Sequence, residues 1–310
     1  MLKYIFYLLV SFITISCVRF PADVETALVL ADDNRAELEL VMEHYRSDRL
    51  KYKAACFLIS NIPYHYTVHD EQLEAFKAYL SRRSTRARLL AFYERTFGPV
   101  SGNKQIKHDL YHITSEYLIR NIDFSFKVWQ ETPWRKSVSF EKFCEELLPY
   151  RLSNEPLEDW KEAYYKTFRH MVDTMSQNHD PAIVCQKLMN HINQQQWIFE
   201  SGLETQGFGA LIMLSKRFGN CKEQAEFITY VMRSLGIPSG IDIIVQNPDN
   251  ANRVHYWNYI RNMEGKTISF DYYEMQLKQR IQKRKYGKIY RQNFPRRGLY
   301  RQIRECSGTA

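Results

Sequence analysis

The chain has 310 residues, of which 45% are apolar and 25% charged, and its formal net charge is +8. This composition allows a substantial buried core beneath a charged surface and argues against a disordered chain. The positive charge is concentrated near the C-terminus, where eleven Lys and Arg residues lie between Glu274 and Arg304. Such a run can contact nucleic acid or anionic lipid. No nucleic-acid fold signature accompanies it, so we interpret residues 276–310 as a solvated basic tail and expect no nucleic-acid partner.

The N-terminal sequence MLKYIFYLLVSFITISC predicts an export signal over residues 1–17. Lys3 precedes a largely apolar run, Tyr4 to Ile15, that is shorter than the ~20 residues needed to span a bilayer. The run ends in TISC, which resembles the lipobox of bacterial lipoproteins, although Thr14 replaces the usual aliphatic residue. We therefore predict a protein exported to the periplasm or outer membrane and lipidated at Cys17. A plain signal peptide without lipidation is the alternative.

Apart from Cys17, the cysteines are odd in number and scattered, which does not indicate a disulfide framework. Three of them lie among apolar neighbours in helical patterns, where a free cysteine usually acts as a small buried hydrophobe: Cys56, Cys144 and Cys185. Cys221 has a different setting, because it follows a Gly-Asn pair and precedes a predicted helix.

Residues 18–197 predict an all-helical region. Apolar residues recur there at three- and four-residue spacings, and two helices carry start signals, Pro156 in one and Asp180-Pro181 in another. His108, His112 and Glu116 would share one helical face if this segment were helical throughout. Asp109 stands where the HExxH metal signature has its glutamate, so we interpret these residues as a polar face and predict no metal site.

Residues 198–275 change in character after Trp197. Glycines at 202, 207, 209 and 219 predict a loop with a short helix, and helical spacing returns over residues 222–235. Gly236 and Pro238 end this helix. Three β-prone segments follow at 240–246, 253–260 and 267–273, with a hairpin turn at 262–266. This order, after a helical region, predicts an α+β protein.

Cys221 is predicted to stand at the N-terminus of the helix over residues 222–235. Unpaired N–H groups and the positive end of the helix dipole favour a thiolate there, and the thiolate is the nucleophilic form. The N–H of Cys221 is also placed to stabilise an oxyanion. Gly219 permits a backbone conformation that other residues avoid. The alternative is a cysteine that only packs beside a turn.

A histidine and an aspartate on neighbouring predicted strands are suited to serve this thiol. With a two-residue period, His255, Trp257 and Tyr259 share one face of their strand. The hairpin turn would bring Asp271 near His255, where a carboxylate fixes the imidazole tautomer and leaves the other ring nitrogen for the thiol. Asp242 competes with Asp271 for this role.

Together, Gly219-Asn220-Cys221, Ala225, LGIPSG at 235–240, HYWN at 255–258 and Asp271 resemble the transglutaminase-like core, a papain-related Cys-His-Asp superfamily. The resemblance covers residues 203–273. It implies a cysteine-bearing helix packed on an antiparallel sheet, with Cys221, His255 and Asp271 as catalytic residues. The helical half is similar to the N-terminal region of transglutaminase-like lipoproteins of Bacteroidetes of unknown function. In longer relatives a segment like GKIYRQNF leads into further β-structure, which implies that residues 276–310 correspond to a link to a further module.

The activity that this resemblance implies is that of an exported cysteine peptidase or amidase acting on a protein, peptide or glycopeptide substrate, without a cofactor. Cys221 would attack an amide carbonyl, His255 would move the proton to the leaving nitrogen, and water would resolve the thioester. The second oxyanion donor is open between Gln206 and Trp257, which also have ordinary interpretations as a loop residue and a core residue. Two alternatives remain: a protein-crosslinking transglutaminase, in which an amine resolves the thioester, and a non-catalytic binding or scaffold module.

Overall fold

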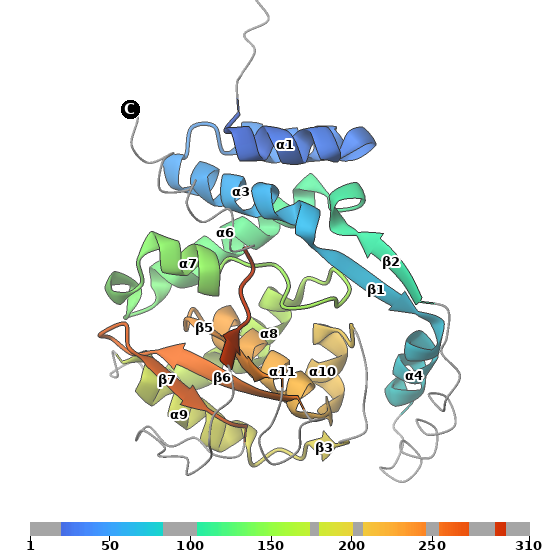
Figure 1. The fold of residues 1–310 in the computed structure, drawn as a ribbon. Helices are drawn as coiled ribbons and strands as arrows, with labels where there is room; N and C mark the ends of the chain where they lie inside the picture. Colours follow the sequence, from blue (N-terminus) through green and yellow to red (C-terminus); the bar gives the residue numbers. More distant parts are fainter. Residues whose placement is uncertain are drawn as a thin grey trace, which may run out of the picture.

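The computed structural model describes residues 20–82, 104–173, 180–200, 207–245, 254–272 and 289–295. Helices pack around a small antiparallel sheet, which confirms the predicted α+β class (Figure 1). The described helices are α1 (Ala22–Leu30), α2 (Arg35–His44), α3 (Arg49–Asn61), α4 (Glu71–Ser81), α6 (Ser115–Glu131), α7 (Phe140–Glu146), α8 (Trp160–Asp173), α9 (Pro181–Ile192), α10 (Ala210–Lys216) and α11 (Cys221–Ser234). The described strands are β1 (Tyr66–Asp70), β2 (Lys104–His108), β3 (Ile198–Phe199), β4 (Phe218–Gly219), β5 (Ser239–Ile244), β6 (His255–Arg261), β7 (Thr267–Phe270) and β8 (Ile289–Arg291).

Side-chain caps fix the starts of several helices. The Asp180 carboxylate accepts the N–H of Ala182, and Pro181 is the first residue of α9, as the sequence predicted. The start predicted at Pro156 is wrong, because α8 begins only at Trp160. The Glu155 carboxylate accepts backbone N–H groups of the preceding residues, at 2.6 and 2.7 Å, and so holds this segment as a loop.

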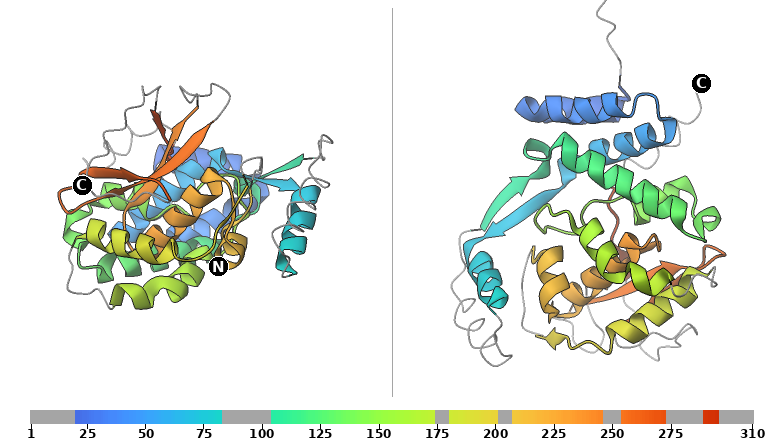
Figure 2. Two further views of the ribbon diagram at one scale, coloured as in Figure 1. Left: turned by 90° about the horizontal axis from the view of Figure 1, so that it is seen from below. Right: turned by 180° about the vertical axis from the view of Figure 1, so that it is seen from behind.

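The prediction of an all-helical region before residue 197 is also wrong. β1 and β2 pair in antiparallel fashion and, with α4, form an arm along one side of the molecule (Figures 1 and 2). The N–H of Val68 in β1 donates to the Asn154 carbonyl, which attaches this arm to the body. His108 ends β2, and His112 lies before the start of α6, so these histidines share no helical face with Glu116.

The main sheet has the strand order β7-β6-β5-β8, with every neighbouring pair antiparallel. Three of its strands and the turn at 262–266 occur where the sequence predicted them. In that turn Gly265 has φ +75°, and the N–H of Asn262 donates to the Lys266 carbonyl at 3.0 Å. The fourth strand, β8, was not predicted and lies within the segment interpreted as a basic tail.

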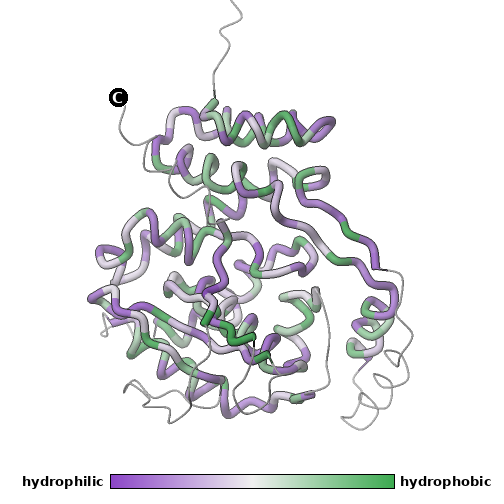
Figure 3. The backbone as a smooth tube through the Cα atoms, viewed as in Figure 1, coloured by the Kyte–Doolittle hydropathy of each residue, from purple (hydrophilic) through white to green (hydrophobic). Residues whose placement is uncertain are grey.

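Helix α11 packs against β5 and β6, and nearly all of its residues are buried. The Asn258 amide of β6 donates to the Ala225 carbonyl and to the Thr229 hydroxyl of α11, which fixes the helix on the sheet. One hydrophobic cluster extends from Val24 in α1 to Phe294 after β8. Hydrophobic and hydrophilic residues alternate along the surrounding helices (Figure 3), as expected for helices with one buried face. In the part of the chain that the structure describes, no helix combines the length and apolarity needed to cross a bilayer.

Candidate active site

Cys221 is the first residue of α11, as the sequence predicted. The Asn220 side chain accepts the N–H of Lys222 at 2.7 Å and also the N–H of Glu223. The Glu223 carboxylate in turn accepts the N–H of Asn220 at 3.0 Å, and this reciprocal pair is a capping box. Gly219 has φ +141°, and a Cβ atom there would lie 2.3 Å from Cβ of Glu223. Only glycine fits this turn. Cys221, which is half-buried, therefore lies at the N-terminus of α11, the positive end of the helix dipole.

His255 at the start of β6 joins Cys221 to Asp271. Its Nε2 atom lies 3.2 Å from Oδ1 of Asp271, the residue that directly follows β7. The Cys221 side chain lies within hydrogen-bonding reach of the same imidazole. Because Asp271 engages Nε2, Nδ1 is the ring nitrogen left for the thiol. The bond to Asp271 and, after it, the bond to Cys221 raise the pKa of His255 to about 9.

Asp242, the competitor for the orienting role, is engaged elsewhere. Its two carboxylate oxygens accept hydrogen bonds from Nε and Nη2 of Arg291 in β8, at 2.8 and 2.9 Å. The Arg291 guanidinium in turn lies 3.8 Å from the centroid of the Tyr259 ring. A bidentate pair of this kind fixes both oxygens of the carboxylate, so the geometry favours Asp271 as the partner of His255.

Of the two residues predicted as candidate oxyanion donors, the structure describes only Trp257. Gln206 lies outside the described residues, as does the lipidation candidate Cys17. Trp257 is half-buried, and its ring stacks on His255 with centroids 5.8 Å apart and planes at 29°. The stack confirms that these two side chains share a face of β6. A role for the Trp257 indole N–H toward an oxyanion stays a prediction.

The other described cysteines have settings that differ from that of Cys221. Cys144 and Cys185 are buried, as predicted, and burial raises the pKa of each thiol well above its ordinary value. Cys56 in α3 is half-buried rather than buried. A thiol with a raised pKa is a poor nucleophile at neutral pH, so Cys144 and Cys185 are structural residues.

Sequence reasoning missed a group of buried polar residues beside the first turns of α11. The Ser153 hydroxyl donates to Glu226 at 2.7 Å, and the Tyr230 hydroxyl donates to Glu155 at 2.7 Å. Lys222 lies 3.7 Å from Glu226, whose pKa burial raises to about 7. These contacts tie α11 to the loop before α8. Helical periodicity could not reveal these contacts, because glutamate side chains are ordinarily exposed. Here Glu226 in α11 and Glu155 in the loop are both buried.

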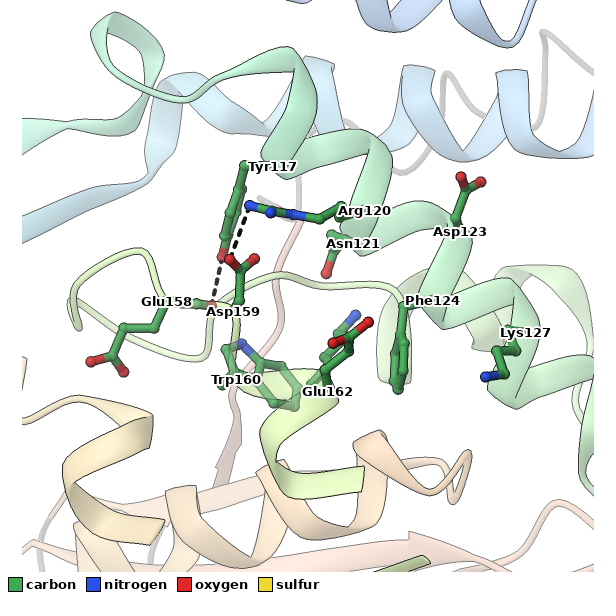
Figure 4. Close-up of a pocket in the computed structure, with 11 residues that line it drawn as sticks. Tyr117, Arg120, Asn121, Asp123, Phe124, Lys127, Glu158, Asp159, Trp160 and Glu162 are labelled. Atoms are coloured by element: carbon green, nitrogen blue, oxygen red, sulfur yellow. Dashed lines mark hydrogen bonds and ion pairs between the residues drawn. The ribbon is translucent and has the colours of Figure 1, made fainter. Parts of the chain in front are cut away.

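A groove of about 340 Å³ lies between α6 and the start of α8, away from Cys221 and His255 (Figure 4). Its carboxylates are paired: Arg120 contacts Asp159 at 2.9 Å, and Lys51 contacts Asp123 at 2.8 Å. The Lys161 amine is buried and donates to the Ser125 hydroxyl and to two carbonyls. The charged groups of this groove therefore have partners within the protein, and we interpret it as a polar contact between two helices.

Within the described ranges, no group of three or more His, Cys, Asp and Glu side chains is placed to hold a metal ion. No protein-family model matches the chain, and no curated protein or solved structure matches it. The arrangement of Cys221, His255 and Asp271 is therefore the feature of the chain that bears on its function.

Proposed function

We propose that the chain is a transglutaminase-like cysteine hydrolase, a peptidase or amidase, with Cys221 as nucleophile, His255 as proton carrier and Asp271 as the residue that orients His255. The observation that carries this proposal is the placement of the His255 ring, which lies 3.2 Å from the Asp271 carboxylate and within reach of the Cys221 side chain. It is reinforced by the position of Cys221 at the N-terminus of a buried helix.

In the proposed reaction the Cys221 thiolate attacks the carbonyl carbon of an amide, forming a C–S bond and a tetrahedral oxyanion. The N–H of Cys221 is placed to stabilise the oxyanion, because the first N–H groups of a helix have no acceptor within it. The His255 imidazolium then donates its proton to the leaving nitrogen, and the C–N bond breaks. Water attacks the thioester, His255 takes a proton from it, and C–S cleavage releases the acid and restores the thiolate.

A His255 pKa of about 9 supports this sequence of proton transfers. The imidazole is protonated at neutral pH, so it begins the reaction as the acid that the leaving nitrogen requires. We expect activity to fall as the pH rises through about 9, because the neutral imidazole cannot protonate the leaving group.

Labelling with iodoacetamide at pH 7, read by peptide mass spectrometry, tests the nucleophile. Wild-type protein should label at Cys221 faster than at Cys56, and Cys221→Ala should abolish the fast phase. His255→Ala should slow labelling of Cys221 by about tenfold or more, since general acid–base partners contribute about 10²-fold or more. Preferential labelling of Cys56, or a Cys221 rate that does not change in His255→Ala, contradicts the proposal.

The fate of the thioester separates the chemical alternatives. A peptide-library digest should yield new termini that disappear in Cys221→Ala. Incorporation of a small primary amine in place of hydrolysis would instead identify a crosslinking transglutaminase, because the amine then resolves the thioester. Fast labelling of Cys221 without either peptide hydrolysis or amine incorporation would support a binding or scaffold module.

We also propose export and lipidation at Cys17, on the strength of the N-terminal sequence alone. Cys17→Ser tests this in cells. The substituted protein should move from the membrane fraction to the soluble fraction, because a thioether-linked lipid cannot form on serine. Unchanged partition would contradict lipidation at this residue.

A further inference from the structure

Trp197 lies where three segments of the candidate active site meet. Its indole N–H donates to the Gly219 carbonyl at 3.0 Å, two residues before Cys221. The N–H of Glu200 donates to the same carbonyl at 3.2 Å, and β3 pairs in parallel with β4. Two donors from the segment 197–200 therefore hold the carbonyl side of the turn that carries the cysteine.

The opposite side of the same peptide unit is also fixed. The N–H of Asn220 donates to Glu223 at 3.0 Å, so the peptide between Gly219 and Asn220 is bonded at both its oxygen and its nitrogen. A rotation of this peptide would have to break bonds on both sides. The direction in which Cys221 leaves the turn is thus set partly by the Trp197 indole.

The ring of Trp197 contacts the other half of the site. Its centroid lies 5.4 Å from that of Tyr272, the residue after Asp271, and 5.6 Å from that of Phe227 in α11. Trp197 and Tyr272 are both buried. One side chain therefore contacts the turn before the nucleophile, the helix that bears it and the strand end that carries the orienting carboxylate.

We propose that Trp197 is a positioning residue that holds the Cys221 turn and the Asp271 strand end at the spacing His255 needs to contact both. This inference rests on the proposed function for its importance in catalysis. The indole N–H sets the turn, and the ring sets the position of Tyr272 and hence of Asp271.

Trp134 offers a matched control at the other end of the same helix. Its indole N–H donates to the Gly236 carbonyl at 2.7 Å, and its ring is buried. Trp197→Phe and Trp134→Phe each remove one buried indole donor from a glycine carbonyl. Both should lower stability, Trp197→Phe by less because the N–H of Glu200 still donates to the Gly219 carbonyl, but only Trp197 lies beside Cys221 and Asp271.

NMR titration of the histidine ring protons tests the proposal without requiring activity, with His255→Ala used to assign the resonance. Trp197→Phe should lower the pKa of His255 by at least about half a unit, because looser contacts to Asp271 and Cys221 stabilise the imidazolium less. Trp134→Phe should leave it unchanged. Tyr272→Leu, which keeps the indole hydrogen bond but removes the ring contact, should also lower it.

Iodoacetamide labelling of Cys221 gives the second readout. Trp197→Phe should slow it by about tenfold, since small misplacements of reacting groups reduce rates by up to about 10²-fold, while Trp134→Phe labels as wild type. A His255 pKa and a labelling rate that are the same in both Trp→Phe variants overturn the positioning role. If the pKa shift occurs but wild-type Cys221 is unreactive, the proposed function fails and the positioning of His255 stands.

Discussion

The two ends of α11 are built with the same device but are exposed to different degrees. At each end a glycine with positive φ has its carbonyl bonded by a tryptophan indole: Gly219 by Trp197 and Gly236 by Trp134. At the C-terminal end the neighbours are fully enclosed, and the N–H of Ile237 returns to a carbonyl of the last turn at 2.9 Å. At the N-terminal end the first residue, Cys221, remains half-buried.

This difference shows which end is available for chemistry. At the C-terminal end of α11, the glycine and the tryptophan end the helix inside the core. Substitutions there should therefore change only the stability of the fold. The N-terminal end closes the helix with a capping box yet leaves a thiol and an imidazole in contact at the surface. Changes there should affect stability and reactivity separately.

Replacing the two glycines should have the largest effects. A Cβ at residue 219 would lie 2.3 Å from Cβ of Glu223, and one at residue 236 would lie 2.5 Å from Cγ2 of Thr132. Left-handed backbone strain of about 1–2 kcal/mol adds to overpacking of about 1–3 kcal/mol. Gly219→Ala and Gly236→Ala should therefore each lower the free energy of unfolding by about 3 kcal/mol in urea titrations.

Gly265→Ala is the control for these two variants. Gly265 has φ +75°, but a Cβ there would meet nothing within 4 Å, so only the backbone strain of about 1 kcal/mol is expected. Gly219→Ala should in addition lose Cys221 labelling under conditions where it remains folded, and Gly236→Ala should keep it. Equal losses of stability in all three variants would show that the contacts around the helix ends do not matter.

Removing the N-cap of α11 should have an intermediate effect. Asn220→Ala leaves the N–H of Lys222 without its side-chain acceptor and should lower the free energy of unfolding by about 1 kcal/mol. Asp180→Ala, which removes the equivalent cap from the N–H of Ala182 in α9, should lower it by the same amount.

Only Asn220→Ala should also slow iodoacetamide labelling of Cys221, because the cap fixes the turn beside the thiol. If both cap variants label at the wild-type rate, the capping box contributes to stability alone, and the two ends of α11 differ less than their exposure suggests.

The sequence predicted the parts of this site that depend on local signals. Gly219 and Asn220 before an apolar-periodic run indicate a helix start, and the β-prone segment at His255 followed by a hairpin turn indicates adjacent strands. The choice between Asp271 and Asp242 required the structure. Asp242 is occupied by Arg291 from β8, and nothing in the local sequence indicates that such a basic segment returns to the sheet.

The same limit explains the errors in the helical half. In the chain, 33 residues lie between Asp70, the last residue of β1, and Lys104, the first residue of β2. Their pairing is therefore a long-range contact, which the periodicity of the sequence does not indicate. In the sequence, Trp197 marks only the point where helical spacing ends. Its hydrogen bond to Gly219 and its contact with Tyr272 join segments that only tertiary folding brings together.

The smallest expected effect is the pH dependence of the N-terminal end of α11. The pKa of His255 is about 9 in the folded protein and about 6.5 when the chain unfolds. A raised pKa stabilises the fold fully below about pH 6.5, and this stabilisation is lost as the pH rises through about 9. Asp271→Asn removes the main cause of the shift. Because the pair is partly exposed, its loss should lower the free energy of unfolding by under about 1 kcal/mol at pH 6, and the difference from wild type should shrink toward zero by pH 10.

Asp242→Asn provides the contrast within the same sheet. It removes an ion pair with Arg291, and a guanidinium does not lose its proton below pH 10, so its destabilisation should be the same at pH 6 and pH 10. Urea midpoints of both variants and of wild type at the two pH values make the measurement. If the Asp271→Asn difference is also constant, the imidazolium does not stabilise the folded state, and the His255–Asp271 pair is as insensitive to pH as the Asp242–Arg291 pair.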